Sequence, residues 1–304
     1  MSPLPRLDGV IPILATPFND DESLDLASLD RMIRFFGAMG CDGVTLLGVL
    51  GESNRLTDAE RTVLIRTAVA AAGKMPVIAG CSHTGTAATI GLCNEAANQG
   101  ASAVMISPSK QPTPNDEAVF TYYSRITEKI TLPIVLQDHP ASTEVYMTAP
   151  LILRIVREVA SIVCVKAEAV PSPPKIAALR AGLPAERNIS ILTGLGGLYG
   201  FFDRERGSDG YNTGFAFPEI LIAMVKADID GAWEIYRRYL PLIVYEQQPG
   251  LAIRKEILRR RGLIANARVR HPGATIDPTT AGQLSVLLDR CFPGQDLAAP
   301  LTVS

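Results

Sequence analysis

One lysine stands at the end of an apolar run. The segment Ile162–Lys166 reads Ile-Val-Cys-Val-Lys, the pattern of a fully buried β-strand that ends in an amine. An amine removed from water loses affinity for its proton, and the free base can attack the carbonyl carbon of a 2-oxo acid to form an imine. The chain has seven lysines, and the other six lie in helical or loop-like stretches. Lys166 is therefore the first candidate for a nucleophile.

Two further polar residues are predicted to lie beside this amine. Side chains alternate along a strand, so Glu168 faces the same way as Lys166 if the strand continues for two residues. A carboxylate there can move protons at carbons next to an imine, and the alternative is a salt bridge with Lys166 fully protonated. Gln137 ends the preceding apolar run, where an amide can exchange hydrogen bonds but cannot shuttle a proton. The predicted catalytic residues are Lys166, Glu168 and Gln137.

The residues after Gln137 alternate in the same way. His139 shares the face of Gln137, whereas Asp138 points to the opposite face. His139 can titrate near neutral pH, but a histidine before Pro140 is more typical of a loop cap than of a catalytic group. The three histidines lie far apart, without H-x-x-x-H or E-x-x-H spacing, and neither a nucleophile elbow nor a P-loop occurs. The sequence predicts no metal and no cofactor.

Glycine-flanked turns follow two other apolar runs. In such turns the backbone N–H groups can approach an anion such as a carboxylate. One turn spans Gly48–Ser53, and the other spans Thr193–Gly197 in a region where barrel proteins often bind anions. The predicted substrate-binding residues are Thr16, Gly48, Val49, Leu50, Gly51, Gly194 and Gly196.

Short apolar runs alternate with amphipathic stretches along most of the chain. The predicted strands are Val10–Ala15, Val44–Leu47, Val77–Ala79, Ala103–Ser107, Ile134–Gln137, Ile162–Lys166, Ile189–Thr193 and Asp209–Thr213. The predicted helices between them are Leu26–Met39, Thr57–Ala72, Thr86–Asn98, Asp116–Ile130, Ala149–Val159, Pro174–Arg180 and Leu198–Arg206. Thr57 and Glu60 have the spacing of a capping box.

Regular alternation of apolar strands and helices is typical of a parallel sheet covered on both faces. Eight such units closing on themselves predict an α/β fold, a (β/α)8 TIM barrel over residues 1–217. Residues 218–304 are predicted to form an all-helical C-terminal extension, with apolar spacing at Trp233 and Tyr236 that favours helix packing. The alternative is an open doubly wound sheet, but no G-x-G-x-x-G follows the first strand. In a barrel, reactive groups collect at the C-terminal ends of the strands.

Composition excludes several classes of function. The chain has 304 residues, is 47% hydrophobic and carries a formal net charge of −2, so no basic field favours nucleic acid or a membrane surface. The run Arg259–Arg261 is predicted to be a solvated helix face. No stretch of ~18 apolar residues predicts a membrane span, and Met1–Arg6 has no signal-peptide pattern. Five scattered cysteines favour reduced thiols in a cytoplasmic protein.

Several motifs together resemble the dihydrodipicolinate synthase / N-acetylneuraminate lyase family of Schiff-base aldolases. The likeness begins with an opening strand and a TPF turn at Gly9–Phe18 and a DG…GTTGE-like segment at Cys41–Ser53. It continues in two later strands, at Pro133–Pro140 and Val163–Glu168. The resemblance covers nearly the whole chain. It implies the barrel, the C-terminal helices, an imine-forming role for Lys166, and a homo-oligomer, either a tetramer built from dimers or a dimer.

The chain departs from the family pattern at the residues that relay protons. The paired threonines of the family are replaced by Val49 and Leu50, and its tyrosine on the fifth strand by Gln137. The usual arginine is replaced within Ala141–Glu144, and a tyrosine that synthases share between subunits falls within Ser107–Lys110. The amine is thus kept while the hydroxyl relay is lost, which argues against dihydrodipicolinate synthase itself and against catalysis across subunits.

Dehydration is the chemistry that the remaining residues favour. Loss of water from a 2-keto-3-deoxy sugar acid needs a base for the C3 proton and an acid for the leaving hydroxyl, and Glu168 can serve as both in sequence. The pairs Gln137-Asp138 and Lys166-x-Glu168 also resemble the 2-keto-3-deoxyarabonate dehydratase branch. Gly51-Glu52 instead keeps an aldolase-like feature, so a pyruvate-dependent aldolase is the alternative. A second alternative is a non-catalytic protein that binds 2-oxo acids or sugar acids.

Overall fold

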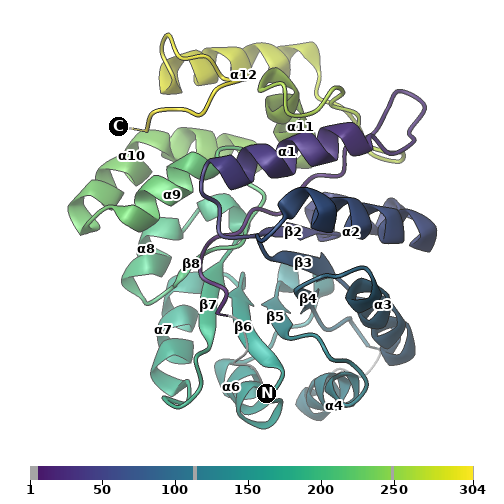
Figure 1. The fold of residues 1–304 in the computed structure, drawn as a ribbon. Helices are drawn as coiled ribbons and strands as arrows, with labels where there is room; N and C mark the ends of the chain where they lie inside the picture. The colour runs from purple at the N-terminus through teal and green to yellow at the C-terminus, as the bar shows by residue number, and fades with distance from the viewer. Residues whose placement is uncertain (1–5, 112–114, 248–249, 304) are drawn as a thin grey trace.

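Eight parallel strands form a closed ring at the centre of the computed structural model, which describes residues 6–111, 115–247 and 250–303. The strands, drawn as arrows in Figure 1, are β1 Gly9–Val10, β2 Val44–Leu46, β3 Val77–Gly80, β4 Ala103–Ile106, β5 Ile134–Asp138, β6 Ile162–Ala167, β7 Ser190–Thr193 and β8 Gly210–Tyr211. β1 pairs with β8, and a parallel bridge between Ile13 and Thr45 joins the first and second strands. The predicted TIM barrel is confirmed.

Helices surround this ring. Those that follow the strands are α1 Leu26–Ala38, α2 Asp58–Ala72, α3 Thr86–Asn98, α4 Asp116–Thr127, α5 Pro140–Thr143, α6 Ala149–Glu158, α7 Ser172–Gly182 and α8 Gly200–Glu205. The C-terminal helices are α9 Pro218–Lys226, α10 Ile229–Gln247, α11 Leu251–Arg260 and α12 Pro278–Cys291. These last helices gather on one side of the barrel, next to α1 (Figure 1). The predicted helical extension is confirmed, while its treatment as a unit separate from residues 1–217 stays a prediction.

A local capping signal explains why helix α2 begins where it does. The predicted capping box at α2 is present, because Thr57 Oγ1 accepts a hydrogen bond from Glu60 N at 3.3 Å and Glu60 Oε2 accepts one from Thr57 N at 2.9 Å.

Among the described helices, none is long and apolar enough to cross a membrane. Residues 1–5, which fall in the segment predicted to lack a signal peptide, lie outside the described part of the chain.

The structure adds detail to the C-terminal region and corrects one expectation about it. Residues 261–277 join α11 to α12 through turns and loop, with Gly262 at a φ of +67°. Trp233 is 40% exposed, and its ring packs edge-on against Phe201 of α8 with the two ring centroids 5.2 Å apart. The run Arg259–Arg261 is not wholly solvated, because Arg261 is buried. Its Nη2 lies 2.5 Å from Glu219 Oε1, and its guanidinium lies over the ring of Phe217. A charge run alone could not reveal this buried partner.

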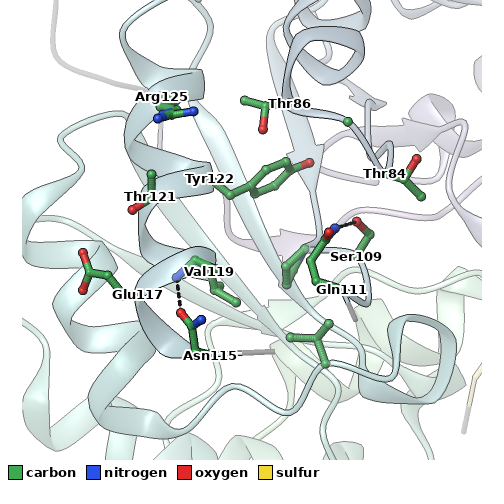
Figure 2. Close-up of a pocket in the computed structure, with 14 residues that line it drawn as sticks. Thr84, Thr86, Ser109, Gln111, Asn115, Glu117, Val119, Thr121, Tyr122 and Arg125 are labelled. Carbon is green, nitrogen blue, oxygen red and sulfur yellow. Dashed lines mark hydrogen bonds between the residues drawn. The ribbon is translucent and has the colours of Figure 1, made fainter. Parts of the chain in front are cut away.

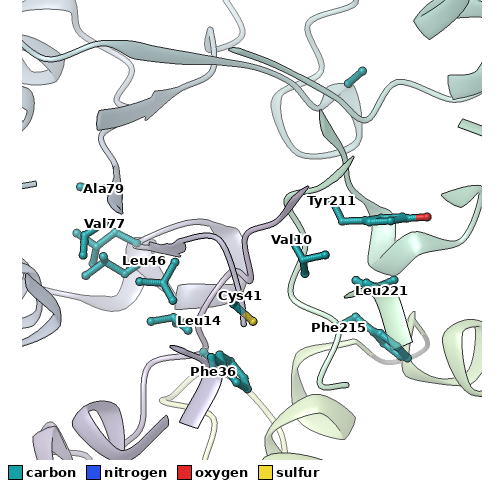
Figure 3. Close-up of a cluster of buried hydrophobic side chains, with 14 of the residues drawn as sticks. Val10, Leu14, Phe36, Cys41, Leu46, Val77, Ala79, Tyr211, Phe215 and Leu221 are labelled. Carbon is teal, nitrogen blue, oxygen red and sulfur yellow. The ribbon is translucent and has the colours of Figure 1, made fainter. Parts of the chain in front are cut away.

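The apolar core has two layers. Apolar side chains fill the inside of the barrel, and these are Leu7, Ile11, Ile78, Ala103, Met105, Val135, Val163, Cys164 and Leu192. A larger layer lies between the strands and the helices, and Figure 3 shows Leu14, Leu46 and Phe36 within it. In β6, Cys164 belongs to the inner layer and Val165 to the outer one, so the next residue returns to the interior. That residue is Lys166.

A buried ion pair ties the extension to the barrel. Lys255 of α11 is fully buried, and its Nζ lies 2.5 Å from Oε1 of Glu52, which follows β2. The same Nζ donates to the carbonyl oxygen of Arg268 at 2.6 Å and lies 4.5 Å from the ring centroid of Phe18. Burial lowers the pKa of Lys255 to about 8, although the Glu52 carboxylate acts in the opposite direction. Nothing in the residue pattern around Lys255 predicts that this helical lysine is buried.

Removing the amine of this pair is expected to destabilise the protein strongly. The variant Lys255→Met leaves the Glu52 carboxylate buried without its nearest cation, which costs about 3 kcal/mol or more of the free energy of unfolding. Urea unfolding followed by circular dichroism measures this change. Lys129→Met, at an exposed lysine, is the matched control and should change stability by less than about 0.5 kcal/mol. Equal stability of the two variants would contradict a stabilising role for the pair.

Candidate active site

Lys166 lies at the wall of a cavity at the C-terminal ends of the strands. Its side chain is only 1% exposed, and the cavity has a volume of about 260 Å³. The residues that line it are Ile13, Val49, Leu50, Gln137, His139, Lys166, Glu168, Leu195, Gly196, Thr213, Gln247, Gly250, Leu251 and Arg254. The lysine therefore faces neither bulk solvent nor a solid core, but a partly open cavity large enough for a small molecule.

The three predicted catalytic residues are in contact with one another. Lys166 Nζ lies 3.0 Å from Glu168 Oε2, and Gln137 Nε2 donates a hydrogen bond to the same oxygen at 2.8 Å. Gln137 and Lys166 are direct neighbours in the register of β5 and β6. Glu168 N donates to Asp138 O at 2.9 Å, which continues the ladder by one residue and keeps Glu168 on the face of Lys166. This is the arrangement that alternation along the strand predicts.

The electrostatics of the carboxylate follow from this contact. Burial alone would raise the pKa of Glu168, but the Lys166 charge, His139 and the Gln137 amide together hold it below the usual range. Glu168 is therefore ionised at neutral pH before substrate arrives, and it can accept a proton but has none to donate. Gly194 leaves room for it, since a Cβ there would lie 2.0 Å from Glu168 Oε1.

The other two residues at the end of β5 separate as the alternation predicts. Asp138 faces away from the cavity and forms an ion pair with Lys175 of α7, while burial raises its pKa despite that cation. His139 lines the cavity, and its Nδ1 lies 2.6 Å from Oγ of Ser142 in the short helix α5. His139 thus borders the cavity and also makes the loop-capping contact expected of a histidine before Pro140.

The predicted substrate-binding residues divide into two groups. Val49, Leu50 and Gly196 line the cavity. The other four, which brace the adjacent turns and do not line it, are Thr16, Gly48, Gly51 and Gly194. Thr16 Oγ1, for example, donates to the carbonyl oxygen of Gly51 at 2.7 Å. Gly196 N already donates to Thr213 Oγ1 at 2.7 Å, so this N–H is not free to bind an anion.

Sequence reasoning missed the residues that the C-terminal extension brings to the cavity. Gln247 ends α10 and Arg254 lies in α11, about eighty residues beyond the last predicted catalytic position. Neither residue stands after a strand, which was the signal used to find the others. Only the packing of α10 and α11 over the mouth of the barrel places them there.

A larger cavity lies elsewhere. It has a volume of about 690 Å³ and is bordered by Tyr122 and Arg125 of α4 on one side and by Thr84 and Ser109 on the other (Figure 2). No lysine, histidine or cysteine is among its described lining residues. Chemistry that needs a nucleophile is therefore better placed at the smaller cavity. In the described ranges, no three Asp, Glu, His or Cys side chains are grouped so that they could hold a metal ion.

The barrel agrees with the comparisons with known proteins. The model of the dihydrodipicolinate synthetase family matches residues 6–290, and the chain belongs to this family. It is 33% identical to L-2-keto-3-deoxyarabonate dehydratase of Azospirillum brasilense over 96% of this chain and 97% of that protein. The crystal structure of dihydrodipicolinate synthase from Rhodopseudomonas palustris superposes with a TM-score of 0.89 at 39% identity, covering 93% of this chain and 97% of the other.

A further structural relative bears on assembly. It is a monomeric variant of dihydrodipicolinate synthase, with a TM-score of 0.87 at 25% identity over 93% of this chain and 96% of that one. Proteins of this fold thus differ in oligomeric state, and the homo-oligomer implied by the sequence motifs stays a prediction.

Proposed function

We propose that the protein is a lyase that forms a Schiff base between Lys166 and a 2-oxo acid, and that it dehydrates a 2-keto-3-deoxy sugar acid. The observation that carries this proposal is the buried contact of Lys166, Glu168 and Gln137 at the wall of a cavity. The relationship to the dehydratase of Azospirillum brasilense supports the same reaction. The five free cysteines support the reducing, cytoplasmic setting in which we place it.

The first step is condensation. The Lys166 nitrogen gives one proton to solvent and reacts as the free amine, while Glu168, 3.0 Å away, stays ionised. The amine attacks C2 and a C–N bond forms. The carbonyl oxygen takes one proton from this nitrogen and one from solvent and leaves as water, which gives the protonated imine. The imine draws electrons from C3 and makes the C3 proton acidic.

Elimination then needs one base and one acid. Glu168 removes the C3 proton, and the electron pair forms an enamine between C2 and C3. The enamine expels the C4 hydroxyl, which takes a proton from the now neutral Glu168 and leaves as water. Proton transfers convert the conjugated imine to a 2,5-dioxo acid, and hydrolysis returns the free Lys166 amine. One residue thus serves in both roles in succession, with Gln137 holding its carboxyl group in place.

Retro-aldol cleavage fits this cavity less well. It requires a base on the C4 hydroxyl, and the positions at which the family carries its hydroxyl relay hold the apolar side chains of Val49 and Leu50 and the amide of Gln137. The residue that favoured an aldolase in the sequence, Glu52, does not line the cavity and is paired with Lys255. A non-catalytic binder would have no need of a carboxylate next to the buried amine.

The products test the proposal. Purified protein is incubated with a panel of 2-keto-3-deoxy sugar acids of different length and stereochemistry, and products are identified by mass spectrometry. We expect a single product that has lost one water, with no pyruvate released. Pyruvate together with an aldehyde would show an aldolase instead. Unchanged substrates, with no borohydride-trapped adduct from any 2-oxo acid, would show a binding protein.

A further inference from the structure

The C-terminal extension brings a buried cation to the cavity. Arg254 of α11 lines the same cavity as Lys166, and its side chain is only 2% exposed. Its Nε donates to Glu246 Oε1 at 2.5 Å. Glu246 is itself fully buried and accepts a hydrogen bond from Ala216 N at 3.1 Å. The pair therefore fixes the guanidinium in one orientation at the cavity wall.

One terminal nitrogen of this guanidinium has no hydrogen-bond acceptor. In the described part of the chain, Arg254 Nη1 is buried and makes no hydrogen bond, and the same holds for Gln247 Nε2 at the same cavity. A buried donor of a charged group without an acceptor is costly, so such groups are rare unless a ligand or water completes them. Two unfilled donors on one small cavity indicate a ligand that carries several oxygen atoms.

Nη1 of Arg254 lies near Leu50, which lines the same cavity as Lys166. A Cβ at Gly214 would lie 2.9 Å from Arg254 Nη1 and 2.5 Å from Leu50 Cδ1, so the guanidinium borders the apolar wall of the cavity. Among the charged groups that line the cavity, Glu168 repels a carboxylate, and the Lys166 nitrogen is used to form the imine. His139 is partly exposed and already contacts Ser142. Arg254 is then the permanent cation that remains for an anionic ligand.

We propose that Arg254 binds the C1 carboxylate of the 2-oxo acid whose C2 carbonyl condenses with Lys166. This assignment rests on the proposed function, because it takes the 2-oxo acid as the ligand of the cavity. Nη1 donates a charge-assisted hydrogen bond to a carboxylate oxygen, which supplies its missing acceptor and orients C2 toward the Lys166 amine. Arg254 in this role selects acids over neutral ketones, a choice that the apolar residues around it cannot make.

The experiment compares an acid with its neutral analogue. Pyruvate and pyruvamide are each trapped with cyanoborohydride, and the rate of adduct formation on Lys166 is divided by the rate on free Nα-acetyl-lysine. In the wild-type protein we expect pyruvate to be preferred by ~10- to 100-fold after this correction, as for loss of one charge-assisted hydrogen bond. In Arg254→Met the preference should disappear, and Arg254→Lys should restore part of it.

Two further variants separate loss of carboxylate binding from loss of the folded structure. Arg254→Met leaves Glu246 buried without its partner, so the double variant Glu246→Gln with Arg254→Met is measured beside it. Glu246→Gln alone keeps the guanidinium and should keep the preference for pyruvate. Loss of the preference in the double variant, in a chain with a native circular dichroism spectrum, supports the assignment.

Three results would overturn it, and they differ from one another. An intact preference in the folded double variant removes Arg254 from carboxylate binding while the Lys166 adduct, and with it the proposed function, stands. Unchanged trapping of pyruvate with loss of turnover only for longer acids would place Arg254 at the far end of the substrate. No wild-type adduct with any 2-oxo acid would remove both the assignment and the proposed function.

Discussion

Lys166→Ala is expected to abolish both the reductively trapped adduct and turnover. The imine needs a nucleophilic nitrogen at this position, and within the described residues no other lysine lines the cavity. The test is incubation with pyruvate and borohydride, followed by mass spectrometry of the intact protein and of its peptides. In the wild-type protein the added mass should lie on the peptide that contains Lys166. Turnover in the variant should fall to the background rate.

A matched control separates loss of chemistry from loss of structure. Lys129→Ala changes an exposed lysine near the end of α4 and should leave the adduct on Lys166 and the rate unchanged. The Lys166→Ala protein must also keep its circular dichroism spectrum, since the substitution leaves Glu168 without its ion-pair partner. An adduct that persists in Lys166→Ala would place the imine on a different lysine.

The sequence alone predicted the barrel because each strand carries its own local signal. Runs such as Ile162–Lys166 are short, apolar and followed by a helix, and this pattern repeats around the ring. The helix boundaries agree within a few residues where a cap is present, as at Thr57. The short helix Pro140–Thr143 was not predicted, because four residues are too few to show helical periodicity.

The candidate site was predictable in the part that depends on strand geometry. Because side chains alternate and β5 is next to β6, the sequence could place Gln137, Lys166 and Glu168 together and Asp138 apart. Arg254 could not be found in this way. Its place depends on how α11 packs over the barrel mouth, which is fixed by tertiary contacts such as the buried pair of Lys255 and Glu52.

The same pair corrects the interpretation of a motif. In the sequence, Gly51-Glu52 favoured aldolase chemistry because it resembles the corresponding residues of the family's aldolases. In the structure, Glu52 follows the turn Val49–Gly51 with a φ of +55°, and it contacts Lys255 and Arg55 instead of the cavity. Glu52 therefore attaches the C-terminal extension to the barrel. The presence of Gly51-Glu52 in a sequence does not discriminate between dehydration and aldol cleavage.

Glu168→Gln is expected to separate imine formation from proton transfer. The amide keeps the size of the side chain but cannot take a proton from C3 or return one to the C4 hydroxyl. We therefore expect the trapped adduct on Lys166 to form still, while turnover of the sugar acid falls by ~10²-fold or more. Exchange of the C3 protons of bound pyruvate with deuterated water, followed by NMR, should fall in parallel, because it reports the same step without any elimination.

A neighbouring carboxylate supplies the control for this variant. Asp138→Asn neutralises a buried acid on the adjacent strand that pairs with Lys175 and faces away from the cavity. It is expected to lower stability but to leave the rate per folded molecule within a few-fold of the wild type, because the Asp138 side chain does not line the cavity. If Glu168→Gln behaved like Asp138→Asn, with a near-normal rate of dehydration, the proton would have to be carried by another group. His139 would then be the next residue to test, since it is the remaining titratable side chain among the described residues that line the cavity beside Lys166 and Arg254.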